Sequence, residues 1–301
     1  MSVAQETGAG IGRFRSDNTV LARARKWCAR FARTQPLGTA CFFVVVLLIV
    51  LAAIGPSIAP HDPASPEFTR LERPSGTNWF GTDELGRDIF TRVLYGARVS
   101  IVVGFGATAL GISVATVIGL VSGYFRGWLD TVVQRFVDGV MAFPVLVLVM
   151  ALMVIVGAGI PQLIIILGLI GAAGSSRVVR SAVLSLRESQ YVEAARAIGA
   201  MSPRIILRHI LPNCFAPIMV TATVGLGNII LAEAALSFLG VGISDPNQPT
   251  WGQMLNRAQR FANVDPLQAL WPGMAIAIAV FSFNMLGDSL RDTLDPRLRG
   301  R

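Results

Sequence analysis

Five long stretches of this 301-residue chain contain no Asp, Glu, Lys or Arg. A helix needs about 20 consecutive, mostly apolar residues to cross the hydrocarbon core of a bilayer, and every stretch is long enough for one. The whole chain is 53% hydrophobic and only 15% charged, which is typical of integral membrane proteins. The stretches lie between Arg33 and Asp62, Arg98 and Arg126, Asp138 and Arg177, Arg208 and Glu233, and Asp265 and Asp288.

The third stretch is long enough for two helices, and Gly157-Ala158-Gly159-Ile160-Pro161 within it predicts a tight turn between them. The sequence therefore predicts an all-α membrane protein with six transmembrane helices. These spans are expected at 37–58, 98–124, 137–157, 161–181, 213–236 and 270–289. Around a core at 98–290, the chain has a basic tail at 1–36, an external segment at 59–97 and a short tail at 291–301.

The distribution of charge predicts how the spans are oriented. Residues 1–36 carry seven basic and two acidic side chains and residues 177–213 carry six and two, whereas residues 59–97 carry four and six. Cytoplasmic loops are enriched in Lys and Arg, so we expect the N-terminus and the 177–213 loop in the cytoplasm. Six spans return the C-terminus to the same side. The net charge of +8 then reflects membrane topology, and no nucleic-acid partner is expected.

The residue types that catalysis and nucleotide binding require are scarce. Lys26 is the only lysine and is followed by Trp27, so the chain has no Gly-Lys-Ser/Thr phosphate-binding loop. His61 and His209 are the only histidines and fall on opposite predicted sides of the membrane, so no zinc centre is expected. A membrane-embedded enzyme is therefore disfavoured, and we expect no metal and no cofactor. Energy for transport would come from another subunit or from an ion gradient.

Glu233 is the acidic residue that falls closest to the interior of a predicted span, near the outer end of the fifth. Proton-coupled secondary transporters usually keep ionisable residues deep in the bilayer, so their scarcity here argues against that class. A carboxyl group at the end of a span is costly unless it faces water or a partner. Two interpretations stay open. Glu233 lines the outer mouth of a pathway, as part of a gate, or it is a hydrated carboxylate at the membrane interface.

The second predicted span carries a row of small residues at four-residue spacing. Such rows allow helix backbones to approach closely in membranes. The partner is either another helix of the same chain or a second subunit. The row consists of Ala107, Gly111, Ala115, Gly119 and Gly123.

Residues 190–212 form a loop between the fourth and fifth predicted spans. Its first part, about 190–198, is amphipathic and predicts a short helix. Gly199 predicts the left-handed residue that ends this helix. Ser202-Pro203 predicts the N-cap and the first residue of a second helix, and Pro212 predicts a further break. The expected structure is a helix, a glycine turn and a helix on the membrane surface.

The 190–212 loop resembles the EAA loop of permease subunits of bacterial ABC importers. His209 departs from the family pattern, in which isoleucine is common. The resemblance implies a cytoplasmic loop that docks onto a separate ATPase subunit, which binds the ATP; the alternative is an ordinary solvated loop. The matching residues are Glu193, Ala194, Ala195, Gly199, Leu211 and Pro212.

Further motifs extend the resemblance to residues 35–298, and they are similar to the C-type permeases of dipeptide and oligopeptide importers. The resemblance implies the type I transmembrane fold of ABC importers in a bacterial plasma membrane. It also implies a second, B-type permease subunit, two ATPase subunits and an extracytoplasmic substrate-binding protein. Similar permeases import nickel or glutathione, so these substrates stay open. In structural terms the motifs predict caps and ion pairs at helix ends. They lie at 79–100, 123–130, 233–240, 251–254, 283–292 and 294–297.

Overall fold

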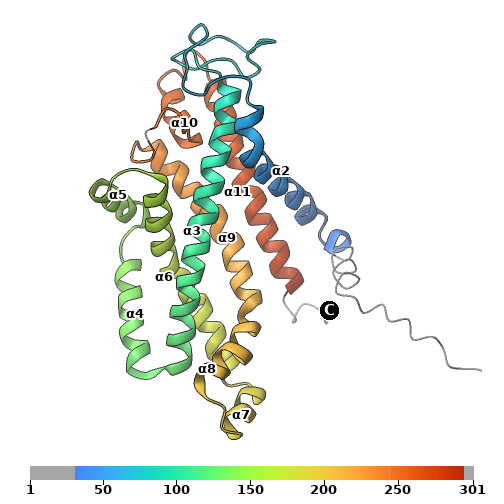
Figure 1. The fold of residues 1–301 in the computed structure, drawn as a ribbon, viewed down its shortest axis with the longest axis vertical. Coiled ribbons are helices and arrows are strands. Elements are labelled where there is room, and N and C mark those ends of the chain that lie inside the picture. Colours follow the sequence, from blue (N-terminus) through green and yellow to red (C-terminus); the bar gives the residue numbers. More distant parts are fainter. Residues whose placement is uncertain (1–30, 244, 295–301) are drawn as a thin grey trace, which may run out of the picture. The chain divides into compact units, whose positions relative to one another are not determined.

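The computed structural model describes residues 31–243 and 245–294 (Figure 1). The chain forms two units, residues 1–36 and residues 37–301. Apart from residues 31–36, the predicted basic tail lies outside the described residues, as do residues 295–301 of the predicted C-terminal tail. The description below concerns the second unit.

Helices make up most of this unit, and the residues that the structure describes contain no β-sheet, only an isolated bridge between Thr82 and Asp88. A π-helical turn at Ile206–Ile210 and a 3-10 turn at Leu211–Cys214 join α8 to α9 without interrupting the helical path. The helices are α2 (Pro36–Ile58), α3 (Ile89–Phe125), α4 (Gly127–Met141), α5 (Val145–Val156), α6 (Ile160–Arg187), α7 (Gln190–Ala197), α8 (Ser202–Ile205), α9 (Phe215–Phe238), α10 (Trp251–Gln259) and α11 (Leu267–Leu294).

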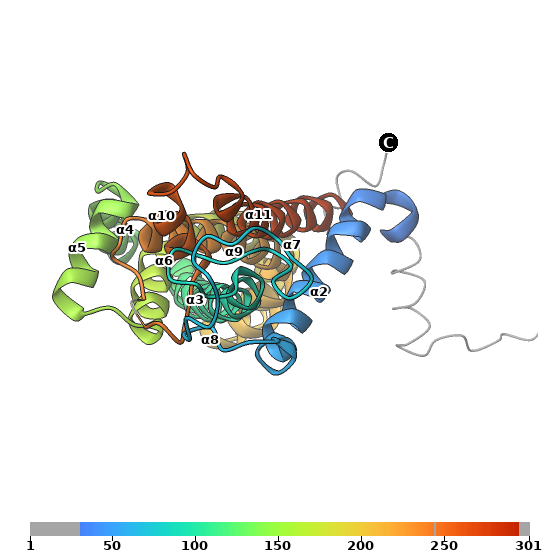
Figure 2. The ribbon, with the colours of Figure 1, turned by 90° about the horizontal axis from the view of Figure 1, so that it is seen from above.

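The long helices α3, α6, α9 and α11 form the centre of the bundle. Helix α3 packs along α6 and α9, and α9 also packs against α11 (Figures 1 and 2). The short helices α7 and α8 lie at one end of the bundle, which we call the α7 end, whereas α10 and residues 59–88 lie at the opposite end, the α10 end (Figure 1). The charge distribution predicts that the 177–213 loop and residues 59–97 lie on opposite sides of the membrane. Their placement at opposite ends of the bundle agrees with that prediction.

Five of the described helices are long and apolar enough to cross a membrane, and the predicted third span at 137–157 is not one of them. Instead, α4 and α5 meet at an angle of 86°. The break falls at Pro144, which lacks an N–H group and disfavours helical geometry at the residue before it. The span predicted at 137–157 is therefore not one helix, and the six predicted spans are reached only when this bent pair counts as one of them.

Helix α3 begins at Ile89, earlier than the predicted residue 98, and its 37 residues extend for about 55 Å, beyond a hydrocarbon core of about 30 Å. Asp88 caps the helix by accepting a hydrogen bond from the Thr91 N–H at 2.9 Å. Arg92 is buried in the first turns and donates to the Pro63 carbonyl at 2.6 Å. Residues 59–88 thus enclose the charge of Arg92. Because the predicted span was taken from an uncharged stretch, the charged first turns of this helix fell outside it.

The small-residue row of α3 packs against α6 of the same chain. A Cβ atom added at Gly111 would lie 2.7 Å from the Gly168 carbonyl oxygen, and one at Gly119 would lie 2.7 Å from the Val179 Cβ. Ala107, Ala115 and Gly123 are also buried along this row. Of the two partners that the sequence leaves open, the structure shows the one within the chain.

Candidate functional site

The 190–212 loop is attached to the α7 end of the bundle by its apolar side. Val192 and Ala195 of α7 are buried, together with Ile205 of α8, in a cluster that also contains Tyr124 and Val183 from α3 and α6. Glu193 and Ala194, on the other side of α7, are exposed. Val192 and Ala195 form the apolar face expected for this segment, whereas Ile198, which was expected on the same face, is exposed. The Glu193 side is open to another molecule.

Gly199 ends α7 as the sequence predicts, with a φ of +79°. The Gly199 N–H donates to the Arg196 carbonyl at 2.9 Å, and the Ala200 N–H donates to the Ala195 carbonyl at 3.0 Å. These two bonds form a Schellman motif, which satisfies carbonyl groups at the end of a helix. The space around Gly199 is open, so glycine is required here by backbone geometry and not by packing.

The second half of the loop differs from the prediction. Met201 occupies the N-cap position of α8 and Ser202 is already its first residue, so the predicted cap was displaced by one residue. Pro212 does not break the path, because the wider π-helical turn before it accommodates a residue that lacks an N–H group. Residues Ser202–Phe238 therefore form one continuous helical run. This run connects the 190–212 loop directly to α9.

The tip of the loop exposes apolar side chains. Ile198 is 85% exposed and Met201 is 80% exposed, on the side that faces away from the buried cluster. Within the described part of the chain, Glu193 makes no ion pair, whereas the neighbouring Glu188 pairs with Arg126 at 3.2 Å. Exposed apolar side chains beside an unpaired carboxylate are typical of a surface that binds another protein.

Polar contacts, whose partners the sequence did not predict, stabilise this end of the bundle. Arg180 of α6 donates two hydrogen bonds, of 2.7 and 2.6 Å, to the Asp130 carboxylate of α4. Ser122 of α3 donates to the same carboxylate at 2.5 Å. The guanidinium groups of Arg187 and Arg196 lie over the Tyr124 ring, 5.8 and 5.6 Å from its centre. Helices α3, α4, α6 and α7 are thereby linked by charged side chains within a small region.

A cavity of about 850 Å³ lies between α3, the α4–α5 break, α6 and α9. Most of its lining is apolar, with isolated polar groups such as Thr108, Thr221 and Asn228, and with the charged Arg291 of α11. Proteins bind small molecules in cavities of this size and character. The α9 part of the lining belongs to the continuous helical run, so the loop and the cavity share one element.

Glu233 does not line this cavity. Its side chain is fully buried, and its two carboxyl oxygens accept hydrogen bonds from Ser100 of α3 at 3.0 Å and from Ser237 at 2.9 Å. Neither an open gate position nor a hydrated interfacial position is seen. The carboxyl group instead joins α9 to α3 close to the α10 end, because the two serines supply the partners that lipid lacks.

Comparisons with known proteins agree with this architecture. The profile of the family described as "Binding-protein-dependent transport system inner membrane component" matches residues 115–300. The chain is 42% identical over 257 residues to the dipeptide transport system permease protein DppC of Alkalihalophilus pseudofirmus, covering 85% of this chain and 83% of the relative. It is 38% identical over 285 residues to the glutathione transport system permease protein GsiD of Pectobacterium atrosepticum, covering 94% of each.

A solved structure also shares the fold. A chain from the inward-facing MetNI methionine ABC transporter superposes with a TM-score of 0.57 at 20% identity. The match covers 68% of this chain and 97% of that chain. At this identity the likeness concerns the fold of the membrane domain, and it agrees with the predicted all-α architecture.

Proposed function

This chain belongs to the family of binding-protein-dependent transport system inner membrane components, and on that basis we propose that it is the permease subunit through which an ATP-driven importer passes short peptides. The observation that carries the proposal is the continuous helical run from Ser202 to Phe238. The first part of this run belongs to the exposed 190–212 loop, and its middle part, between residues 216 and 232, lines the cavity. A displacement of the loop therefore moves a wall of the cavity.

In this proposal the α7 end faces the cytoplasm, as the excess of basic residues in 177–213 indicates. Both termini lie on that side of the bacterial inner membrane. An ATPase subunit binds the tip of the 190–212 loop, through the exposed Ile198 and Met201 and through Glu193. Two such ATPases bind the ATP, so this subunit contributes no catalytic residue and no cofactor.

A second, B-type permease completes the pathway, of which this chain forms half, and an extracytoplasmic binding protein delivers the substrate to the α10 end. A largely apolar lining with few polar groups suits a pathway that must release its cargo. We place dipeptides or oligopeptides first and glutathione second. The relatives carry both names, and glutathione is itself a short peptide.

The test is uptake by the complete transporter, with both permeases, the ATPases and the binding protein, in proteoliposomes. We expect uptake of a labelled dipeptide that requires internal ATP and persists when an ionophore removes the proton gradient. Glutathione is tested in parallel. Uptake that follows the proton gradient and ignores ATP would contradict the proposal.

Replacing Gly199 with valine should uncouple transport while the protein still folds. A β-branched residue is strained at a φ of +79°, so the turn after α7 must rearrange although the space around it is open. We expect a fall in ATP-dependent uptake of about tenfold, which corresponds to about 1.4 kcal/mol of strain. The matched control is Gly199→Asn, because asparagine tolerates the left-handed region; normal uptake by Gly199→Val would show that the turn is dispensable.

Replacing Glu193 with lysine should weaken binding of the ATPases. Glu193 is exposed and makes no ion pair within the described chain, so its charge is available to a basic group on a partner. The control is Glu188→Lys, because Glu188 is 65% exposed and pairs within the chain with Arg126. Pull-down measures the bound ATPase. Equal recovery with both variants would contradict an intersubunit role for Glu193.

A further inference from the structure

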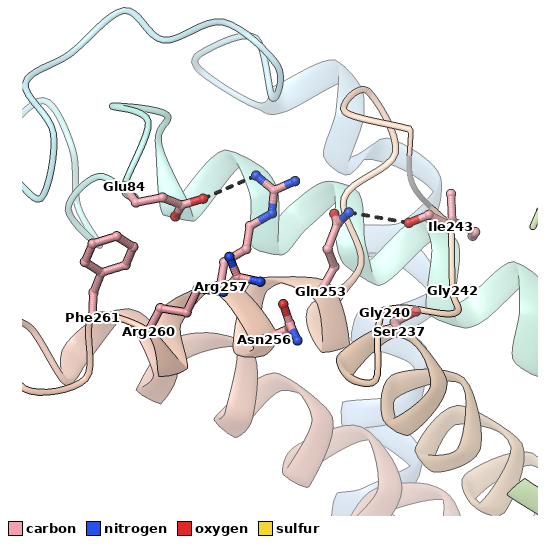
Figure 3. A pocket seen from close by; sticks show the side chains of 10 residues that line it. All are labelled: Glu84, Ser237, Gly240, Gly242, Ile243, Gln253, Asn256, Arg257, Arg260 and Phe261. Carbon is pink, nitrogen blue, oxygen red and sulfur yellow. Dashed lines mark hydrogen bonds and ion pairs between the residues drawn. The ribbon is translucent and has the colours of Figure 1, made fainter. Parts of the chain in front are cut away.

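A second hollow, of about 380 Å³, lies at the α10 end, separate from the large cavity (Figure 3). One face of α10 forms much of its wall, with side chains spaced three and four residues apart, so that they project from the same side of the helix. The opposite wall is formed by Gly240, Gly242 and Ile243, after α9. The polar side chains from α10 are Gln253, Asn256 and Arg257, and Arg260 follows directly after the helix.

Helix α10 is held rigidly by its other face. The Trp251 side chain is 1% exposed, and its Nε1–H donates to the Val93 carbonyl at 2.9 Å. A Cβ atom at Gly252 would lie only 2.0 Å from the Ala234 carbonyl oxygen, so α10 contacts the backbone of α9 there. The polar face is therefore presented at a fixed position, as a binding site requires.

Positive charge is in excess beside this hollow. Glu84, which also lines the hollow, forms ion pairs with Arg257 at 3.2 Å and Arg87 at 3.5 Å. Asp83 forms ion pairs with Arg87 at 2.5 Å and Arg92 at 3.6 Å. Two carboxylates thus form ion pairs with three guanidinium groups, so this network carries one more positive than negative charge. The fourth arginine of this region, Arg260, has no ion pair among the described residues, and its guanidinium points into the hollow (Figure 3).

The same hollow has an unused hydrogen-bond acceptor. The Gln253 side-chain N–H donates to the Ile243 carbonyl at 3.5 Å, which orients the amide. The Gln253 Oε1 atom is buried and has no hydrogen-bond partner in the described chain. Buried polar atoms normally have partners, so this acceptor suggests a ligand that supplies an N–H group.

We propose that this hollow binds the free carboxylate of the last residue of a short peptide. Arg260 pairs with the carboxylate, and Gln253 accepts a hydrogen bond from the peptide N–H next to it. Guanidinium groups bind carboxylates in a bidentate manner. An acidic side chain of a partner protein offers a carboxylate without an adjacent N–H, so it satisfies only half of the site. This inference rests on the proposed function, because it assigns a position for its substrate.

The test uses the complete permease and ATPase assembly in nanodiscs, without binding protein. In a background lacking Cys28, Cys41 and Cys214, Phe261→Cys places a thiol in the wall of the hollow. We expect dialanine to slow its reaction with a thiol reagent and dialanine amide to have no effect. Arg260→Gln should raise the dialanine concentration for half protection about tenfold, as expected when a charge-assisted hydrogen bond is lost.

Arg73→Gln is the matched control, since Arg73 is an exposed arginine of the segment at the same end and does not line the hollow. Arg73→Gln should leave the protection of the thiol by dialanine unchanged, and Arg260→Lys should retain part of this protection. Equal protection by the acid and the amide overturns the inference, and so does slowed labelling by peptide-free binding protein alone. Dialanine uptake without selective protection also overturns it but leaves the proposed function standing. Selective protection without ATP-driven uptake contradicts the proposed function alone.

Discussion

Replacing Gly111 with valine should sharply destabilise the isolated subunit. A Cβ atom at this position would lie 2.7 Å from the Gly168 carbonyl oxygen, and a backbone atom cannot move aside as a flexible side chain can. Helices α3 and α6 would have to separate along their contact. Overpacking of this kind costs about 1–3 kcal/mol, or more where backbone must shift.

The matched control for this variant is Gly171→Val in α6. Both changes place valine in a membrane helix, but the space around Gly171 is open. Thermal denaturation in detergent, followed by size-exclusion chromatography, measures the difference. If both variants melt at the same temperature, close packing of α3 on α6 does not determine the stability of the bundle.

Replacing Asp130 with asparagine should loosen α4. Asp130 accepts two hydrogen bonds from Arg180 and one from Ser122, and its side chain is only 13% exposed. Val137 is the only buried residue of α4, so this polar contact holds the helix where apolar packing is sparse. We expect a loss of about 1–2 kcal/mol, and faster hydrogen exchange of the α4 amides.

Asp138→Asn is the control, because Asp138 pairs with Arg177 on the same two helices. That pair is 49% and 43% exposed, and exposed ion pairs contribute about 0–1 kcal/mol. Hydrogen exchange measured by mass spectrometry should therefore show little change for this variant. An equal effect of the two substitutions would mean that burial of the Asp130 pair adds nothing to its strength.

Local patterns predicted much of this fold. The uncharged stretches located the apolar helices, because charge is expelled from the hydrocarbon core whatever the rest of the fold is. Gly199 was predicted as the end of a helix, because a left-handed residue is a property of the backbone next to it. The α4–α5 break was missed although Pro144 is present in the sequence, because the stretch after Asp138 contains no charged residue and therefore favoured one span.

The contacts between distant residues could not be predicted from local patterns. Asp130 and Arg180 are 50 residues apart in the chain, and only the packing of α4 on α6 brings them together. The polar face of α10 had a detectable signal, since Gln253, Asn256, Arg257 and Arg260 follow helical spacing. That spacing predicts a polar helix face, but it does not reveal that the face lines a hollow.

The hydrogen bond from Ser100 to Glu233 spans 133 residues of sequence, and this has a consequence for biosynthesis. The ribosome completes α3 long before α9. If α9 entered lipid alone, Ser237 would be the only partner of its carboxyl group, and the second oxygen would face hydrocarbon. Insertion of α9 is therefore more favourable when α3 is already beside it, so we expect the earlier helix to guide the later one into the membrane.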